Sequence, residues 1–354
     1  MRTTILTFQF AHNYGALLQA YALKKFVSLN GNETTIAPYY PEWAQAEYAI
    51  SPFAKNIPPR RRIRLAMQYS KRRKLSSIFE SFIREELAVK DTFDNHEALQ
   101  AWINENDYVI CGSDQIWNNL ITKDDPSYFA VGSGAKKIAY AASTGTTALN
   151  ETQKKFITRY LPDFKAISVR EPDSAKQIEQ ILDKKIQVVM DPVFLLPGSE
   201  WDLLASPIDI SGPYMFLYFL QENEGLLNYA KEYAKENGLI IYDVHPTMAK
   251  HHEGCKRLDL VGPKEFLWLI KYAECVCTNS FHATSFSTIY RKKLLHIPNS
   301  KSPERTISLL KRAGFDLIPS GNLPFYELNC SNRDGLNKEI ETSKQFLLSS
   351  LGKE

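Results

Sequence analysis

Three candidate catalytic side chains each come within a few residues of the end of a short apolar run. They are Asp114, Arg170 and His282. A carboxylate can act as a base, a guanidinium clamps a phosphate or carboxylate, and an imidazole moves protons near neutral pH. Each also has a structural alternative: Asp114 as a helix cap, Arg170 in an ion pair with Glu171 or Asp173, and His282 in a capping cluster.

Small and hydroxyl-bearing residues accompany these three in similar loops. Asn13 opens a helix whose free N–H groups favour an anion, although a tight turn capped by Asn13 is the plainer alternative. Arg305 begins a later helix and is a second candidate for clamping an anion. The expected substrate-binding residues are Asn13, Tyr14, Gly15, Ser113, Ser143, Asn279, Ser280 and Arg305.

The elements that carry these loops alternate between short strand-like runs and helical patterns, which is typical of βα units and a mostly parallel sheet. The alternation stops at 191–213, which holds four prolines and two glycines, and restarts at Tyr214. We therefore expect an α/β fold of two Rossmann-like domains, 1–195 and 196–354, facing each other across a cleft. In such sheets ligands bind at the carboxyl ends of the strands.

Composition narrows the function classes. The 354 residues are 44% hydrophobic and 23% charged, with a net charge of +3, which excludes disordered and fibrous classes. The longest apolar run, 214–220, is far shorter than the roughly 20 residues of a membrane span, and no secretory signal precedes the first strand. A cytoplasmic location is expected. No metal site is expected either: His245, His251 and His252 lack a carboxylate-rich motif beside them and are interpreted as surface residues.

A basic segment, 60–82, is the one concentrated positive feature. Its first part, 60–74, carries eight Lys and Arg residues and no acid, interleaved with apolar residues at helical spacing. Such a helix either lies on an anionic membrane surface or acceptor, or forms a solvated face packed on its domain. Nucleic acid is not an expected partner, because no recognised motif is present and the rest of the chain is slightly acidic. Dinucleotide and P-loop fingerprints are absent from the sequence as well.

Taken together, the motifs resemble those of the polysaccharide pyruvyl transferase family, in order along nearly the whole chain. They lie at 13–23, 112–117, 141–143, 168–171, 191–193 and 278–284. The resemblance implies the glycosyltransferase-B arrangement. It also implies transfer of the enolpyruvyl group of phosphoenolpyruvate onto two hydroxyls of a sugar, giving a pyruvate ketal in exopolysaccharide, capsule or cell-wall glycan. Phosphoenolpyruvate is then the donor substrate, and no cofactor is implied.

The resemblance also implies roles for single residues. Arg170 is expected on the phosphate or carboxylate of the donor, and His282 as a proton donor or an acid on the phosphate side. Asp114 is a candidate base for the sugar hydroxyl, as a mechanistic hypothesis rather than a family match. The first domain is expected to take the acceptor, a sugar or lipid-linked oligosaccharide, with the basic helix at the inner membrane face; the second domain is expected to take the donor. Thr144 departs from the family, which often has an aromatic residue there. Two alternatives stay open: a nucleotide-sugar glycosyltransferase on the same scaffold, and a non-catalytic glycan-binding protein.

Overall fold

The computed structural model describes residues 1–49, 51, 59–245, 252–300, 303–315, 317, 326–329 and 334–353, with only the backbone at 59–61, 64, 65, 329 and 334. The chain divides into two compact units. Unit 1 comprises Met1–Tyr69, Phe79–Leu195 and Glu339–Glu354, and unit 2 comprises Ser70–Ile78 and Leu196–Lys338. Each unit is described by itself below.

Unit 1 is built on a parallel sheet of six strands in the order β2-β1-β3-β4-β5-β6. Its central strands are buried on both faces, as expected where helices cover a parallel sheet. The strands are β1 (Arg2–Leu6), β2 (Glu33–Ile36), β3 (Tyr108–Cys111), β4 (Lys136–Ala142), β5 (Phe164–Val169) and β6 (Gln187–Val188). The chain adds β2 on one side of β1 and the later strands on the other side. The strand order therefore reverses between β1 and β3, and ligands bind at such a switch point.

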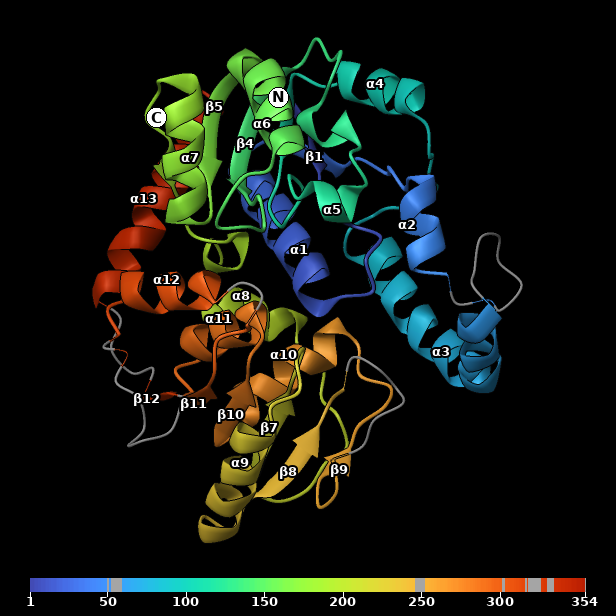
Figure 1. Ribbon diagram of the computed structural model, residues 1–354, viewed down its shortest axis with the longest axis vertical. Helices are drawn as coiled ribbons and strands as arrows, with labels where there is room; N and C mark the ends of the chain where they lie inside the picture. Colours follow the sequence, from blue (N-terminus) through green and yellow to red (C-terminus); the bar gives the residue numbers. More distant parts are fainter. Residues whose placement is uncertain are drawn as a thin grey trace. The chain divides into compact units, whose positions relative to one another are not determined.

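The helices of unit 1 follow these strands, and α6 and α7 lie side by side next to β5 (Figure 1). Asn side chains accept a backbone N–H at the start of four of them, which explains where α1, α4, α5 and α6 begin. The helices are α1 (Tyr14–Leu29), α2 (Glu42–Glu47), α4 (His96–Asn104), α5 (Asn119–Thr122), α6 (Glu151–Tyr160) and α7 (Pro172–Leu182). Short 3-10 turns lie at Pro126–Phe129, Leu161–Asp163 and Pro192–Phe194.

Unit 2 repeats the design with a second sheet of six strands in the order β12-β11-β10-β7-β8-β9, in which only the edge strand β12 is antiparallel. The strands are β7 (Tyr214–Tyr218), β8 (Ile240–Asp243), β9 (Lys256–Arg257), β10 (Cys275–Thr278), β11 (Lys293–His296) and β12 (Tyr326–Asn329). The helices are α8 (Gly198–Leu204), α9 (Glu224–Glu236), α10 (Pro263–Tyr272), α11 (Phe281–Ile289) and α12 (Glu304–Arg312). The strand order of this sheet reverses between β7 and β10. The expected α/β class with two Rossmann-like units is confirmed.

Two expectations about boundaries differ from the structure. The sequence pattern predicts the first strand over 5–10, but the strand ends at Leu6, because Phe8 and Phe10 belong to a buried aromatic cluster in the loop that follows. The chain does change units at Leu195, but the end of α13 (Asp334–Ser350) belongs to unit 1 rather than to the second domain. There Ser343 Oγ accepts a hydrogen bond of 2.8 Å from the Met190 N–H, and the Ser350 carbonyl accepts one of 2.7 Å from Lys165.

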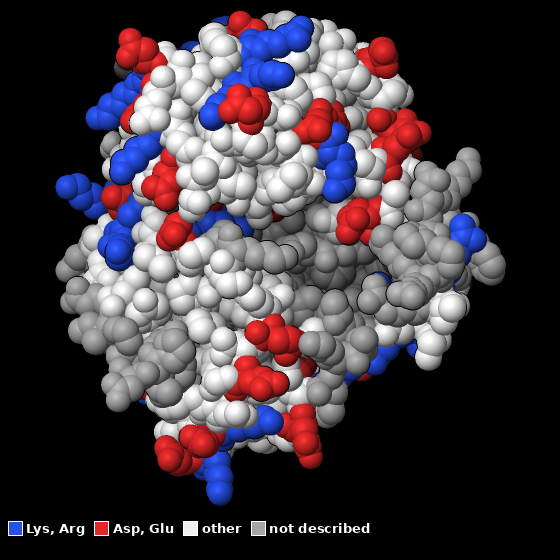
Figure 2. Space-filling view, in the orientation of Figure 1, with Lys and Arg blue, Asp and Glu red and all other residues white. Residues whose placement is uncertain are grey.

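The basic segment forms one long helix, α3 (Pro59–Glu85), whose two ends are buried differently. Phe79 and Phe82 near its end are each 2% exposed, whereas Ile63 and Met67 near its start are 66% and 83% exposed. Elsewhere, on the face of unit 1 drawn in Figure 2, Lys and Arg are interspersed with Asp and Glu. Among the described residues, no helix combines the length and the apolar character needed to cross a membrane.

Candidate functional site

The start of α1 lies at the carboxyl end of β1, the first strand beside the point where the sheet of unit 1 reverses. Asn13 is exposed and its Oδ1 accepts a 3.2 Å hydrogen bond from the Ala16 N–H, so its side chain caps the helix. Tyr14 is buried with its ring 5.3 Å from that of Phe79 in α3, and Gly15 is buried beside it. The structure therefore shows the plainer role for Asn13, a cap, at the place where an anion was expected.

His12, directly before this cap, was not among the predicted site residues. Its ring stacks on that of Phe79 at 5.4 Å. Burial lowers the pKa of the His12 imidazole below its usual value, and the negative charge of Glu80 offsets part of this effect. Its position two residues before a helix, in the loop after a strand, is the sequence signal by which it could have been found.

The loop after β3 carries Ser113 and Asp114 and is fixed by a buried glutamine of α1. Gln19 Oε1 accepts from the Ser113 N–H at 3.2 Å, while Gln19 Nε2 donates to Thr7 Oγ1 at 2.9 Å. Gly112 makes the turn possible: its φ is +128°, and a Cβ there would lie 2.3 Å from the Tyr140 carbonyl oxygen. Sequence reasoning missed Gln19, whose role depends on a contact 94 residues away.

Asp114 itself is half-buried. Its Oδ1 accepts a 2.8 Å hydrogen bond from the N–H of the next residue, Gln115, and its carbonyl accepts from the Ser143 N–H at 3.0 Å. Asp114 is not the helix cap of the structural alternative, because Asn118 caps α5, the helix that follows. In the described part of the chain, no hydrogen bond engages Oδ2. Burial and then the negative charge of Asp114 raise the pKa of the Tyr48 hydroxyl to about 12. Asp114 thus combines one carboxylate oxygen bound to the backbone with a second oxygen that can accept a proton.

Ser143 serves the same loop region from the end of β4. Its side chain is fully buried and its Oγ accepts from the Gly145 N–H at 3.1 Å, while its carbonyl accepts from the Trp117 N–H at 3.2 Å. Through these contacts Ser143 links the loop after β4 to the loop after β3 at the carboxyl edge of the sheet.

Arg170, after β5, is held between two carboxylates. Its Nε donates to Glu171 Oε1 at 2.9 Å and its Nη1 donates to Asp191 Oδ2 at 2.8 Å, and only 3% of its side chain is exposed. Burial by itself lowers the pKa of the guanidinium, but the charges of Glu171, Asp191 and Asp114 outweigh it, so the pKa lies above its usual value. The ion-pair alternative holds, with Asp191 as the second partner in place of Asp173.

Asp191 was missed as a site residue, although the sequence motif 191–193 contains it. It is 1% exposed, and besides Arg170 its Oδ2 accepts a 3.4 Å hydrogen bond from Ser113 Oγ. A chain of contacts thus runs from Arg170 through Asp191 to Ser113, the neighbour of Asp114. Through Asp191, Arg170 helps to position the loop after β3.

In unit 2 the loop after β10 leads into α11 and is bonded to the segment that follows the neighbouring strand β7. Asn279 is 2% exposed, and its Oδ1 accepts from the Leu220 N–H at 2.8 Å and the Gln221 N–H at 3.3 Å. Ser280 caps α11 by accepting from the Ala283 N–H at 3.4 Å. Asn279 and Ser280, both predicted to bind substrate, therefore hydrogen-bond the backbone around the start of α11, where His282 lies.

His282 and Arg305 are brought together by the ring of Phe281. The His282 ring meets it edge-on at 5.1 Å, and the Arg305 guanidinium lies over it at 5.3 Å. His282 is in the first turn of α11, at the positive end of the helix dipole, and is 8% exposed. The start of this nine-residue helix therefore combines a cationic side chain with an imidazole.

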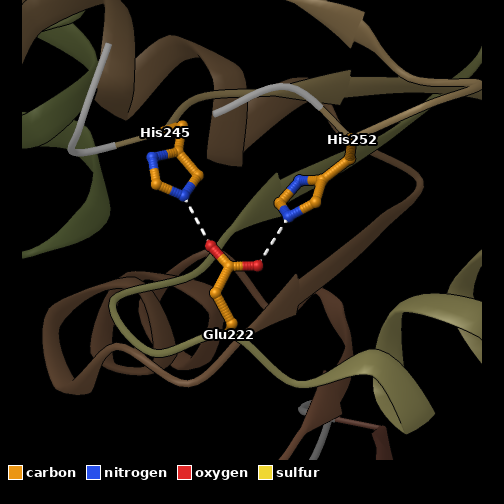
Figure 3. Close-up of side chains that lie close together, drawn as sticks. All are labelled: Glu222, His245 and His252. Atoms are coloured by element: carbon orange, nitrogen blue, oxygen red, sulfur yellow. Dashed lines mark hydrogen bonds and ion pairs between the residues drawn. The ribbon is translucent and has the colours of Figure 1, made fainter. Parts of the chain in front are cut away.

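The expectation that His245 and His252 are surface residues is wrong, because their side chains are only 6% and 7% exposed. His252 and His245 both direct a ring nitrogen at the carboxylate of Glu222 (Figure 3). The missing carboxylates come from elsewhere in the chain: Glu222 follows β7, and Asp243 ends β8. His251 lies outside the described residues.

Comparison with known proteins supports this fold and names a family. The model of the family described as polysaccharide pyruvyl transferase matches residues 13–301. The S. aureus MnaA–UDP co-structure is similar with a TM-score of 0.52 at 9% identity, covering 98% of this chain and 89% of that one. The UDP-GlcNAc 2-epimerase of Methanocaldococcus jannaschii is similar with a TM-score of 0.50 at 12% identity, covering 99% and 100%.

A putative UDP-N-acetylglucosamine 2-epimerase from Listeria monocytogenes is similar at a TM-score of 0.50 and 10% identity, covering 99% of this chain and 88% of that one. At such identities the likeness shows the fold alone, and it agrees with the glycosyltransferase-B class. None of the curated proteins compared with the chain matches it.

Proposed function

Because the chain belongs to the polysaccharide pyruvyl transferase family, we propose that it transfers the enolpyruvyl group of phosphoenolpyruvate to two hydroxyls of a sugar. The product is a pyruvate ketal in exopolysaccharide, capsule or cell-wall glycan. The grouping of His282 and Arg305 around Phe281 at the start of α11 is the observation that carries the proposal. A small, multiply charged anion needs oriented positive partners, and a guanidinium beside a helix N-terminus supplies them.

We assign the donor to unit 2. Arg305 binds the phosphate or carboxylate of phosphoenolpyruvate, and His282 donates a proton to its methylene carbon, so that C2 becomes electrophilic. The oxygen of one sugar hydroxyl attacks C2, the bond from C2 to the phosphate oxygen breaks, and the second hydroxyl takes the place of the phosphate. One of the two hydroxyl protons returns to His282 and replaces the proton given to the methylene carbon. A base takes the other hydroxyl proton and passes it to the released phosphate.

We assign the acceptor sugar to unit 1, with Asp114 as the candidate base. The half-buried carboxylate of Asp114 stands on a loop that Gln19 and Ser113 hold in place. Arg170 acts here as a positioning residue in place of the donor ligand that the family resemblance implied, since its Nε and Nη1 are committed to Glu171 and Asp191. This assignment requires no metal for the transfer.

Turnover provides the direct test. The purified chain is incubated with phosphoenolpyruvate and a panel of methyl hexosides and N-acetylhexosaminides, and inorganic phosphate is measured together with the mass of the sugar. The proposal expects phosphate release that depends on both substrates and a sugar that gains one pyruvate ketal. Stabilisation by a nucleoside diphosphate, together with no phosphate release from phosphoenolpyruvate, would favour the glycosyltransferase alternative. Phosphate release without a modified sugar would mean that water, and none of the sugars tested, is the acceptor, and would contradict the proposed transfer to them. Binding of sugars without turnover would favour a glycan-binding protein.

For the start of α3 we propose contact with an anionic lipid surface, which would bring the chain to a lipid-linked acceptor. Met67 and Ile63 expose their apolar side chains among basic residues of the same helix, a pattern suited to a membrane interface. Met67→Ser is expected to weaken co-sedimentation with phosphatidylserine vesicles. Leu203→Ser is the matched control, because Leu203 in α8 is also 83% exposed. Equal binding of the Met67 variant and wild type would contradict this contact.

A further inference from the structure

We propose that Glu222, His245 and His252 form a binding site for a divalent transition metal, for which zinc is the best fit. Glu222 Oε1 lies 2.7 Å from His245 Nε2, and Glu222 Oε2 lies 2.9 Å from His252 Nε2 (Figure 3). The ligand atoms of the three residues all lie within 4.8 Å of one another. With bonds of about 2.0–2.1 Å, the donor atoms of a tetrahedral zinc site are roughly 3.3 Å apart, so small side-chain shifts would accommodate the ion.

Asp243 provides an independent indication. Its Oδ2 lies 2.8 Å from His252 Nδ1, and none of its side chain is exposed. Because a carboxylate only accepts, His252 Nδ1 carries the proton and Nε2 is the nitrogen turned toward Glu222. A buried carboxylate that orients a histidine in this way is the usual outer partner of a metal-bound imidazole, since it fixes the tautomer and makes the ligand more basic.

The charges of the cluster also call for a cation. With Nδ1 protonated, the lone pair of His252 Nε2 would face the carboxylate of Glu222 at 2.9 Å, which is repulsive unless a proton or a metal ion stands between them. Asp243 adds a second negative charge, and within the described residues its Oδ1 has no hydrogen-bond partner. A divalent ion would balance the two carboxylates and let both imidazoles stay neutral.

The donor set and its location fit a metal site with an open position. Two imidazoles and one carboxylate are the ligands of catalytic zinc sites, whereas magnesium and calcium prefer oxygen alone. The side chains of His245 and His252 are 6% and 7% exposed, while that of Glu222 is 38% exposed, so the cluster opens to solvent on the side of the carboxylate. A water or the oxygen of a ligand would complete the coordination there.

The backbone around the cluster is held in place by the neighbouring strand loop. Glu222 directly follows Leu220 and Gln221, whose N–H groups are bound by Asn279 Oδ1, and Asn279 Nδ2 also donates to the Gln221 carbonyl. The metal position thus lies at the carboxyl edge of the sheet of unit 2, on the strand next to the one that leads into α11. This proposal does not rest on the proposed transfer reaction.

Zinc binding to the untagged full chain, stripped with a chelator, tests the proposal by calorimetry. We expect one zinc ion per chain at this site, with magnesium binding at least a hundredfold more weakly. Cobalt bound in its place is expected to show the visible absorption of a four- or five-coordinate ion with nitrogen ligands. Glu222→Gln and His245→Ala are each expected to weaken zinc binding at least a hundredfold. Asp243→Asn should weaken it by about 10- to 100-fold, the effect usual for an outer partner.

Controls separate loss of the site from loss of the fold. Glu222→Gln keeps the size of an exposed side chain, and its melting temperature without metal should match that of the wild type. His96→Ala removes a half-buried histidine of unit 1 and should leave zinc binding unchanged. The proposal is overturned if the stripped chain binds no zinc, if magnesium binds as well as zinc, or if Glu222→Gln and His245→Ala bind zinc like the wild type. In these cases protons bridge Glu222 to the two histidines.

Discussion

In unit 1 the arginine at the carboxyl edge of the sheet is held between two carboxylates, whereas in unit 2 the corresponding arginine lies over an aromatic ring. Arg170 is 4% exposed and pairs with Glu171 and Asp191. Arg305 is half-buried and lies 5.3 Å from the centre of the Phe281 ring, beside His282. The two carboxylates neutralise the charge of Arg170, whereas the ring of Phe281 is itself uncharged and attracts the guanidinium of Arg305 without neutralising it.

The same topology therefore supports two kinds of edge. In both sheets the strand order reverses next to the first strand. In both, a buried amide side chain, Gln19 or Asn279, hydrogen-bonds the backbone of the adjacent loop. In unit 1 the charges are used to position Asp114, while in unit 2 they are presented at a helix N-terminus. This difference is why we place the anionic donor in unit 2.

The largest effect is expected for His282→Gln. If His282 is the proton donor, kcat/KM for phosphoenolpyruvate should fall by about 10²- to 10⁴-fold, the usual contribution of a general acid. The melting temperature should stay close to that of the wild type, because the substitution keeps a polar side chain at the start of α11. His96→Gln, in unit 1, is the control and should retain full activity. Wild-type turnover by the His282 variant would remove this residue from the reaction.

Arg170→Ala is instead expected to lower the free energy of unfolding. It leaves Glu171 and Asp191 buried without their cation, and breaking such a pair costs about 3–5 kcal/mol in the free energy of unfolding. The contact of Arg305 with the Phe281 ring is worth about 0.5–1 kcal/mol at a partly exposed site, so Arg305→Ala is expected to cost less stability than Arg170→Ala. Urea denaturation of the two variants measures the difference. Equal losses in both would abolish the contrast between the two edges.

A third effect concerns acid stability and belongs to unit 2. His296, at the end of β11, is fully buried and donates from Nδ1 to the Thr278 carbonyl at 3.0 Å. Burial lowers the pKa of this imidazole to about 4 from 6.5. Between these values the unfolded chain binds the proton and the folded chain does not, so stability should fall as the pH drops from 6.5 toward 4. The loss can reach about 3 kcal/mol.

Unfolding free energies measured across this pH range test the contribution of His296. A His296→Gln variant should show a flatter profile than the wild type over the same range. If the two profiles are parallel, His296 is not the residue that makes unit 2 sensitive to acid.

Much of this architecture can be predicted from the sequence because local patterns determine it. The helix that Asn13 opens follows from capping, and the restart of the strands at Tyr214 follows from a short apolar run; both are found in place. Contacts between distant segments are different. Arg170 pairs with Asp191, 21 residues away, and His252 meets Glu222, 30 residues away. Only the order of strands in the sheets brings these side chains together, and spacing in the sequence does not reveal it.

The same reason explains why several predicted binding residues turn out to hold backbone. A polar residue after a strand has the same sequence signature whether it binds a ligand or caps a helix. In the structure Asn13 and Ser280 cap helices, and Ser143 and Asn279 fasten loops. Asp114 and His282 remain as the candidates that combine a structural contact with a group able to exchange a proton.

Calorimetric titration with phosphoenolpyruvate, compared with uridine diphosphate, tests the central claim most directly. The account predicts that phosphoenolpyruvate binds the wild type, that Arg305→Ala weakens this binding at least tenfold without unfolding the chain, and that uridine diphosphate produces no comparable heat. Binding of uridine diphosphate together with no detectable binding of phosphoenolpyruvate at millimolar concentration would contradict it.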